Sequence, residues 1–206
     1  MWIDHIAIGV DDLDTGAAEF RRRYGLGAVS GGVHPEGTRN RNIPLRPPQY
    51  IELVEVWHDA APLGRLTAEK LARGERLLGM AIEAGHIEEI ANRFGIRPET
   101  GQIELPDGTT GTWSHLAHPT ETWLPFYISY ATGIAGRQER VARWQQRYDD
   151  AGHDRPPGAI RGVEIGGDPE VLTQWLGGGA LPLRHVPGTP GLHSFTYEHG
   201  RDVEVR

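Results

Sequence analysis

The residues best suited to chemistry in this sequence are one histidine and one glutamate, His5 and Glu52, each inside a short apolar stretch. An imidazole and a carboxylate can pass a proton to and from a bound molecule when both lie within hydrogen-bond reach of it. The same pair suits a divalent ion of zinc, iron, manganese or nickel. The chain contains no cysteine, so thiol catalysis and thiolate ligands are excluded.

Alternation along two predicted strands indicates that these two side chains point into one hollow. In the N-terminal stretch WIDHIAIGV, His5 shares its face with Ala7, and branched aliphatic residues occupy the other face. In the strand predicted at 49–57, Glu52 shares its face with Tyr50. The branched faces are expected to pack on helices. The faces that carry small residues, the imidazole and the carboxylate are therefore expected to line a concave surface.

Two less specific interpretations stand beside this one. His5 could be a hydrogen-bonded residue of the fold rather than a ligand or a catalyst. Glu52 could form an ion pair with Arg39 or Arg41 of the neighbouring strand, which would leave no free carboxylate in the hollow.

The segment HPEGTRNRNIPL (34–45) supplies a second set of polar candidates. His34 is a candidate to move protons together with Glu52. Asn40 and Arg41 are candidates to bind a polar or anionic small molecule, because a guanidinium suits carboxylates and phosphates and an amide both donates and accepts. An exposed hairpin with solvated charges explains the same residues equally well.

Two later stretches supply candidates for contacts with a ligand. In GTWSHLAH (111–118), Trp113 and His115 share one face, and the sequence does not say whether that face is the concave one. In LPFYISY (124–130), alternation is taken to point Tyr127 and Ser129 inward, as for Tyr50. For the aromatic residues, packing in the core is the competing interpretation.

Length and charge limit the class of protein. The 206 residues suffice for one large domain or two fused small ones. A formal net charge of −7 argues against a nucleic-acid surface. No apolar run approaches the roughly 18 residues of a membrane span, and the N-terminus lacks the basic and apolar regions of a signal peptide. We therefore expect a cytoplasmic protein without membrane contact, and no organic cofactor is implied.

The elements that carry these residues repeat along the chain. A β-α-β-β-β order over the first quarter returns later, where Ala81 falls over Ala7 and Phe94 over Phe20 at a shift of 74 residues (81 − 7 and 94 − 20). Such self-similarity is typical of a duplicated structural unit. The predicted organisation is a first module at 1–58, a second at 75–131 that pairs with it, a helix and linker at 136–158, and a third, shorter βαβββ-like module at 159–206.

A repeated β-α-β-β-β unit, with histidine on the first strand and glutamate on the fourth, resembles the vicinal oxygen chelate superfamily in its glyoxalase-like domain branch. The resemblance is carried by DHIAIGVDDLD (4–14), HPEGTRNRNIPL (34–45), YIELVEV (50–56), LLGMAIEA (77–84), PDGTTGTW (106–113) and LPFYIS (124–129). It implies an α+β fold in which repeated βαβββ modules form curved mixed sheets around a concave cleft, as in glyoxalase, bleomycin-resistance proteins and extradiol dioxygenases.

The resemblance also implies a metal site. In this superfamily the positions of His5 and Glu52 hold a divalent ion, and two more ligands come from the second module. Shifts of 74 and 77 residues place Gly79 and Ser129 at those positions, and neither is a usual ligand for a transition metal. A third ligand would have to come from elsewhere; the candidates are His34 and His115. Modules of this superfamily pair within one chain or across a homodimer. A homodimer is therefore a possible partner arrangement for this chain.

Three hypotheses about function follow. The first is a metal-dependent enzyme of the lyase or isomerase type; ring-cleaving oxygenation is less favoured because the second-module histidine is missing. The second is a metal-free protein that binds or sequesters a small molecule in the same cleft, as resistance proteins do. The third is a metal-free enzyme that uses His5, Glu52 or His34 for proton transfer. We expect an enzyme acting on a small polar or anionic molecule, with the binding or resistance protein as the alternative.

Overall fold

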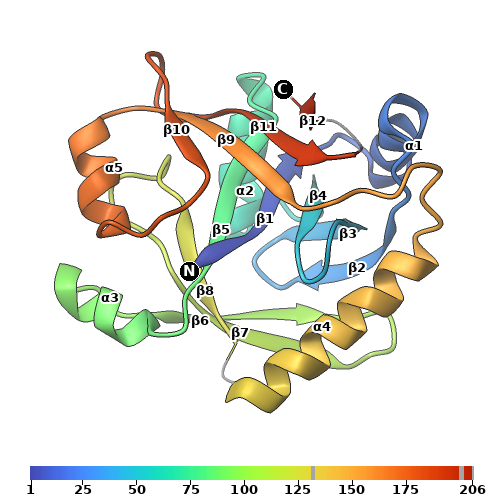
Figure 1. Cartoon of the computed structure of the whole chain (residues 1–206), viewed down its shortest axis with the longest axis horizontal. Helices are drawn as coiled ribbons and strands as arrows, with labels where there is room; N and C mark the ends of the chain where they lie inside the picture. Colours follow the sequence, from blue (N-terminus) through green and yellow to red (C-terminus); the bar gives the residue numbers. More distant parts are fainter. Residues whose placement is uncertain (131–132, 200–201, 206) are drawn as a thin grey trace.

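The protein is described here by a computed structural model that covers residues 1–130, 133–199 and 202–205. Its largest part is a closed barrel built from β1 (Trp2–Gly9), β2 (Val29–His34), β3 (Thr38–Pro44), β4 (Tyr50–Val56), β5 (Leu77–Glu83), β6 (Glu99–Glu104), β7 (Thr110–Leu116) and β8 (Phe126–Ser129). The strand order is β1-β4-β3-β2-β6-β7-β8-β5 (Figure 1). The helices are α1 (Leu13–Tyr24), α2 (Pro62–Ala72), α3 (Ile87–Phe94), α4 (Gly133–Asp150) and α5 (Pro169–Leu176). The predicted α+β fold with curved mixed sheets is confirmed.

The first helix begins and ends where its local sequence dictates. The Asp12 carboxylate accepts the backbone N–H of Thr15 at 2.8 Å, which satisfies a donor that has no partner within the helix. Gly25 follows the last turn with φ of +73°, a left-handed conformation that glycine adopts without steric cost. Leu13 and Phe20 are buried, and α1 packs on the outer face of β3 and β4.

The strands that carry the histidine and the glutamate lie side by side. Strand β1 is parallel to β4, with His5 in register with Tyr50 and Ala7 in register with Glu52. Residues in register on neighbouring strands point to the same face. His5 and Glu52 therefore share the inner face of the barrel, while Ile6 and its neighbours on the outer face are fully buried against the helices.

A bulge alters this alternation at the start of β1. The pairing of β1 with β5 shifts between Ile3 and His5, which leaves Asp4 as an additional residue. A bulge of this kind redirects a side chain. The carboxylate of Asp4 consequently contacts the His5 ring instead of pointing away from it.

Two helices lie against the inner surface of the barrel. On α2, Leu71 approaches so closely that a Cβ on Gly9 would lie 2.4 Å from its Cδ2. On α4, Trp144 stacks on the Tyr50 ring with centroids 4.1 Å apart. Helix α2 was not among the predicted elements; it sits in the segment between the first two modules. Figure 1 shows α4 passing beside β2 and β3.

The C-terminal part forms a separate sheet from β9 (Ile160–Gly166), β10 (Leu183–His185), β11 (Gly191–Glu198) and β12 (Asp202–Val205). The predicted order strand, helix, three strands is present. The order within the sheet, β10-β9-β11-β12, differs from β1-β4-β3-β2, because its first strand is internal rather than at one end of the unit. The Asp168 side chain accepts the backbone N–H of Glu170 and Pro169 begins α5, as a helix start requires. None of the helices within the described ranges is long and apolar enough to cross a membrane.

The segment that returns from α4 to the barrel contains a pH-sensitive contact. His153 Nδ1 accepts the backbone N–H of Gly27 at 3.0 Å, and burial lowers the pKa of His153 below its usual 6.5. The folded protein therefore favours the neutral ring. Its contribution to the free energy of unfolding is complete above pH 6.5 and is lost as pH falls through the lower folded-state pKa.

We expect that His153→Asn, which keeps an acceptor but cannot titrate, reduces the loss of stability between pH 7.5 and pH 5. Urea unfolding of the parent and the variant at both pH values measures this difference, with an effect of about 1 kcal/mol, the size of one hydrogen bond. Equal losses in both proteins would contradict the prediction.

Candidate functional site

The site is centred on the Glu52 carboxylate, which the inner face of β4 directs into the barrel. His5 Nε2 lies 3.5 Å from Glu52 Oε2, and His34 Nε2 lies 3.9 Å from Oε1. The side-chain N–H of Asn40 donates a short hydrogen bond to Oε1. Arg39 binds Glu55 at 2.7 Å instead. Among the described residues, the Glu52 carboxylate thus has two imidazoles and one amide as neighbours and no ion pair with arginine.

The Asn40 amide is fixed from its other end. Asn40 Oδ1 accepts the backbone N–H of Gly32 at 2.8 Å. A Cβ on Gly31 would lie 1.7 Å from the same oxygen, so only glycine permits this approach. The two glycines of β2 therefore orient Asn40 so that its Nδ2 faces Glu52.

The His5 ring is held by a carboxylate and by two aromatic side chains. Its Nδ1 lies 2.8 Å from Asp4 Oδ1, and its face stacks on Tyr50 with centroids 4.6 Å apart. The Phe126 ring lies 5.8 Å away in an edge-on arrangement. A carboxylate on one ring nitrogen orients an imidazole for proton transfer through the other. In this site the other nitrogen faces Glu52.

The carboxylate behind His5 is neutralised from α4. Arg140 forms short ion pairs with Asp4 and Glu83, and the Tyr130 hydroxyl donates to Asp4 at 3.4 Å. Burial raises the pKa of Asp4, but the hydrogen bond from His5 and the charge of Arg140 outweigh burial, so the pKa lies below its usual value. For Glu83, burial outweighs Arg140 and raises the pKa. Asp4 is therefore the ionised partner of His5 at neutral pH.

Aromatic rings close the site on two sides. Tyr50 lies between the His5 ring and Trp144 of α4, and burial raises its pKa well above 10. The hydroxyl of Tyr50 therefore stays neutral. On the opposite side the ring centroids of Trp113 and His34 lie 5.9 Å apart. His34 Nδ1 lies 2.9 Å from the Thr38 hydroxyl oxygen.

Open space lies beside this cluster on the inner face of the barrel. Gly79 on β5 is in register with Ala7 on β1, and Ala7 is in register with Glu52 on β4. A Cβ added to Gly79 would meet no atom within 4 Å. Side chains in register on neighbouring strands point the same way, so this space belongs to the face that presents Glu52. A small molecule placed there would be close to the carboxylate.

Three predicted contact residues lie on the wrong face. Arg41 points outward and pairs with Asp14 of α1. Tyr127 is fully buried outside the barrel, where its hydroxyl donates to the backbone carbonyl of Trp175 at 2.9 Å. Ser129, two residues further along β8, shares the face of Tyr127. These residues cannot contact a molecule beside Glu52.

The error in β8 is a slip of one residue. The prediction placed Tyr127 over Tyr50, but Tyr50 is in register with His5 and Phe126 is in register with Ala81. The spacing is 45 residues in both cases (50 − 5 and 126 − 81). Phe126 therefore occupies the inward position, and its ring contacts His5. A slip of one residue moves every side chain of a strand to its other face.

His115 lies on the same face of β7 as Trp113, and the contact of Trp113 with His34 identifies that face as the inner one. The His115 side chain is 30% exposed and its Nε2 lies 3.6 Å from Glu99 at the edge of the sheet. Its strand, β7, is four strands away from β4 in either direction around the barrel.

The donor set does not fit a metal site of three or more protein ligands. Within the described residues, no three histidine, aspartate or glutamate side chains are grouped as metal ligands would be. His5 and His34 approach different oxygens of the single Glu52 carboxylate, and one of those oxygens accepts from Asn40. Catalytic zinc sites normally have three protein ligands, whereas His5 and Glu52 supply two.

The described residues of the second module add no free metal ligand near His5 and Glu52. The inner faces of β5 and β8 present Ala81, Phe126 and Ile128 near His5. Glu83, the carboxylate at the end of β5, is bound to Arg140. Members of the superfamily commonly bind divalent ions, but the usual second pair of ligands is missing here by residue type.

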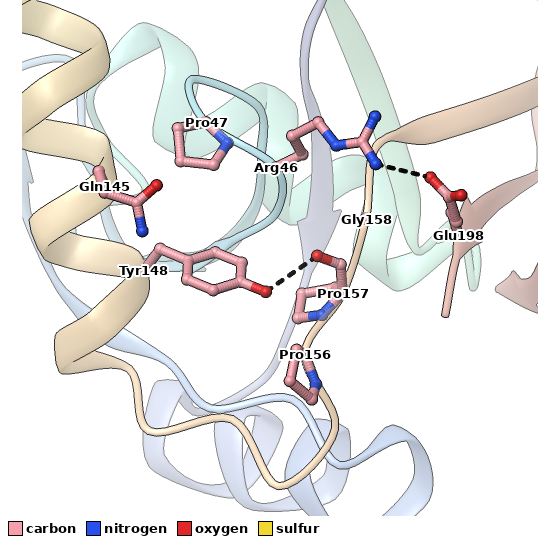
Figure 2. Close-up of a pocket in the computed structure, with 8 residues that line it drawn as sticks. All are labelled: Arg46, Pro47, Gln145, Tyr148, Pro156, Pro157, Gly158 and Glu198. Carbon is pink, nitrogen blue, oxygen red and sulfur yellow. Dashed lines mark hydrogen bonds and ion pairs between the residues drawn. The ribbon is translucent and has the colours of Figure 1, made fainter. Parts of the chain in front are cut away.

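A surface pocket of about 450 Å³ lies elsewhere, between α4, the β3–β4 connection and β11. Figure 2 shows two pairs of its polar groups bound to each other. Arg46 donates to Glu198 at 3.0 Å, and the Tyr148 hydroxyl donates to the carbonyl of Pro157 at 3.1 Å. The pocket contains neither His5 nor Glu52 and is not part of the site.

The residues that sequence reasoning missed are Asp4 and the inward side chains of α4. Alternation assigns Asp4 to the outer face. The bulge that turns its side chain inward has no clear signal in the sequence. Helix α4 does carry a signal: Arg140, Trp144 and Arg147 recur at spacings of four and three residues, which places them on one face of a helix. A helix face that carries large and cationic side chains is compatible with burial against a polar site as well as with exposure to solvent.

The paired βαβββ modules, with His5 on the first strand and Glu52 on the fourth, define a member of the vicinal oxygen chelate superfamily. The family model described as "Glyoxalase-like domain" matches residues 3–180, and the chain belongs to that family. No curated protein matches the sequence.

Solved structures share the fold at low sequence identity. A hypothetical protein from Staphylococcus aureus is 16% identical with a TM-score of 0.66, over 98% of this chain and 83% of the other. Streptomyces coelicolor methylmalonyl-CoA epimerase in complex with 2-nitronate-propionyl-CoA is 20% identical with a TM-score of 0.48, over 64% and 98%. The epimerase from Mycobacterium tuberculosis is 14% identical with a TM-score of 0.46, over 66% and 91%. These likenesses concern the fold alone. The cytoplasmic location, the homodimer and the lack of an organic cofactor stay predictions.

Proposed function

We propose that this protein is an enzyme of the isomerase or lyase type that moves a proton on a small polar or anionic molecule, with Glu52 as the acid–base group. The single observation that carries the proposal is the Glu52 carboxylate itself, which faces two imidazoles and open space inside the barrel. A carboxylate in such a setting can accept a proton from a bound molecule and return it.

The proposed reaction balances without an oxidant. Glu52 takes a proton from a carbon next to a carbonyl group, and the electron pair of the C–H bond passes to the carbonyl oxygen to give an enolate. His34, 3.9 Å from the same carboxylate, is placed to stabilise the oxygen or to supply a proton to it. Return of the proton to the same carbon gives an epimer. Where that carbon carries a hydroxyl group, the hydroxyl proton passes to the enolate oxygen, and return of the carbon proton to the former carbonyl carbon gives an isomer.

His5 is proposed to position and polarise Glu52. Asp4 fixes one ring nitrogen, so the other nitrogen faces the carboxylate at 3.5 Å. A divalent ion on His5 and Glu52 would act as a Lewis acid on the same carbonyl. Only two ligands support such an ion, and the proposed roles of the residues do not depend on it.

A metal-free binding or resistance protein is the second candidate. It is favoured by Ala81 and Ile128, which the register places in the second module at the counterparts of His5 and Glu52, since neither side chain can bind a metal. The aromatic walls formed by Tyr50 and Trp113 would then hold the ligand without reaction. A measurement of turnover separates the two candidates, because only the enzyme converts its ligand.

We expect the parent protein to catalyse exchange of carbon-bound protons in deuterated water for a small oxo acid or ketone. The probes are pyruvate, hydroxypyruvate, hydroxyacetone and dihydroxyacetone phosphate, followed by proton NMR against a protein-free blank. Glu52→Gln should lower the exchange rate about 10²- to 10⁴-fold, the usual contribution of a general base. Glu55→Gln, on the outer face of β4, is the matched control.

Blocking the open space provides an independent test. Gly79→Leu should abolish exchange by filling that space. Because a Cβ there meets no atom within 4 Å, the unfolding midpoint should stay near that of the parent. Elemental analysis of each protein reports bound metal. Ligand-induced thermal stabilisation without any exchange would favour the binding protein. Exchange unaffected by both Glu52→Gln and Gly79→Leu would refute the proposed site.

A further inference from the structure

Arg147 of α4 has a guanidinium nitrogen without a hydrogen-bond acceptor beside β2. Its Nη2 donates to the backbone carbonyl of Ser30 at 2.6 Å, and its guanidinium carbon lies 5.1 Å from the Trp144 ring centroid. Its Nε is buried and has no hydrogen-bond acceptor within the described parts of the chain. No carboxylate there forms an ion pair with it. Burial lowers the pKa of Arg147, yet arginine remains charged at neutral pH.

A buried acceptor without a donor lies on β3, beside the segment of β2 whose carbonyl binds Arg147. Asn42 is 8% exposed, and its Oδ1 has no hydrogen-bond donor among the described residues. Asn42 is in register with Glu52 on β4 and with Val29 on β2. Ser30, whose carbonyl holds Arg147, follows Val29 directly. The free Nε–H and the free carbonyl oxygen therefore belong to the same end of the β2–β3 ladder, where α4 passes (Figure 1).

Three other arginines around the barrel are paired with carboxylates. Arg39 binds Glu55, and Arg41 binds Asp14 on the outer face. Arg140 is engaged by Asp4 and Glu83. Arg41 was predicted to bind an acidic group of a ligand. Arg147 is better suited to that role, because it approaches the inner face from α4, whereas Arg41 points outward from β3.

We propose that Arg147 and Asn42 determine the substrate class, and that this class is a small carboxylate with a hydroxyl group near its carbonyl. The inference rests on the proposed function for the chemistry at Glu52. The carboxylate would accept from Arg147 Nε, and the hydroxyl would donate to Asn42 Oδ1. Side chains in register on adjacent strands lie about 5 Å apart, so a hydroxyl on Asn42 brings its carbon beside Glu52.

Burial without partners explains why a ligand is expected. Native proteins satisfy nearly all buried polar groups, and a donor and an acceptor left free at one site call for a specific cause. A molecule with one acceptor and one donor a few bonds apart satisfies both groups at once. A neutral ketone supplies no anion for Arg147, and an unhydroxylated acid supplies no donor for Asn42.

The test uses isothermal titration in the Glu52→Gln protein, so that binding is measured without turnover. Hydroxypyruvate is the probe; pyruvate lacks its hydroxyl group, hydroxyacetone lacks its carboxylate, and dihydroxyacetone phosphate replaces the carboxylate by phosphate. We expect hydroxypyruvate to bind most tightly of the four. Arg147→Gln should weaken it by about tenfold or more, as loss of a hydrogen bond to a charged group predicts. Arg143→Gln on the same helix is the matched control and should change nothing.

Two further variants separate recognition from folding. Arg147→Lys keeps the charge but lacks Nε, and should also bind hydroxypyruvate more weakly. Asn42→Leu should weaken hydroxypyruvate but leave pyruvate unchanged. Tighter binding of the phosphate, equal binding of all four probes, or binding indifferent to Arg147 would overturn the inference. Arg147-dependent binding without proton exchange in the parent would refute only the proposed reaction, and exchange that ignores Arg147 would refute only this inference.

Discussion

Replacing Arg140 by methionine is expected to lower the free energy of unfolding by about 3 to 5 kcal/mol, the usual effect of removing one partner from a buried ion pair. Arg140 is 6% exposed, and it is the guanidinium that neutralises Asp4, which is fully buried, and Glu83. Without it two carboxylates stay inside the protein with their negative charges uncompensated. Urea denaturation at pH 7 measures the difference.

The matched control is Arg143→Met on the exposed face of α4, which should change stability by less than about 0.5 kcal/mol. Adding Asp4→Asn and Glu83→Gln to the Arg140 variant should recover much of the loss, because the uncompensated charges are then gone. A loss no larger than that of Arg143→Met would contradict the prediction.

The two carboxylates should respond differently to pH. The folded-state pKa of Asp4 lies below 3.8, so its contribution to stability is complete at neutral pH and is lost as pH falls through that lower value. The folded-state pKa of Glu83 lies above 4.5, so its contribution is complete below that value and is lost as pH rises through the folded-state pKa. At pH 7, Asp4→Asn is therefore the more damaging single change of the two.

Replacing Trp175 by alanine is expected to cost about 3 to 5 kcal/mol, the range for deleting a large buried aromatic side chain. Trp175 is 1% exposed and joins α5 to the outer face of the barrel. Its ring packs on Tyr127 and Phe94 with centroids 5.2 and 4.8 Å away. Its Nε1 donates to the carbonyl of Pro125 at 2.7 Å, so alanine also leaves a buried acceptor without its donor.

Trp57→Ala provides the matched control, because Trp57 is 55% exposed and should cost less than about 1 kcal/mol. Chemical unfolding followed by circular dichroism compares the two variants. The Trp175 variant should retain the Glu52 site, since Tyr127 lies outside the barrel. Loss of proton exchange in a folded Trp175 variant would show that the C-terminal sheet acts on the site, against this expectation.

Local pattern was informative where side chains alternate without interruption. Along β4, Glu52 and Tyr50 point inward as alternation predicts, and the same holds for His5 on β1. Asp12 and Gly25 mark the two ends of α1 through contacts made within a few residues. These features depend on neighbours in sequence, so one sequence suffices to predict them.

Register between distant strands was not predictable in the same way. Tyr127 was assigned to the inner face from its likeness to Tyr50, and the pairing of Ala81 with Phe126 moved it outward. The inward turn of Asp4 depends on a bulge against β5. Arg41 was correctly placed on a strand, but the partner that holds it, Asp14, comes from a helix packed on the outer face.

The sequence by itself predicted that His5 and Glu52 share one face, because that follows from the period of side chains along a strand, and it predicted the superfamily through the resemblance of its motifs. Only the tertiary structure decided which groups complete the site. Arg140, Trp144 and Arg147 enter from α4, more than 80 residues after Glu52 in the sequence (140 − 52), through packing that alternation along one segment cannot specify. The approach of Arg147 from α4, the orientation of His5 and the position of Tyr127 outside the barrel all depend on contacts between segments that are distant in sequence.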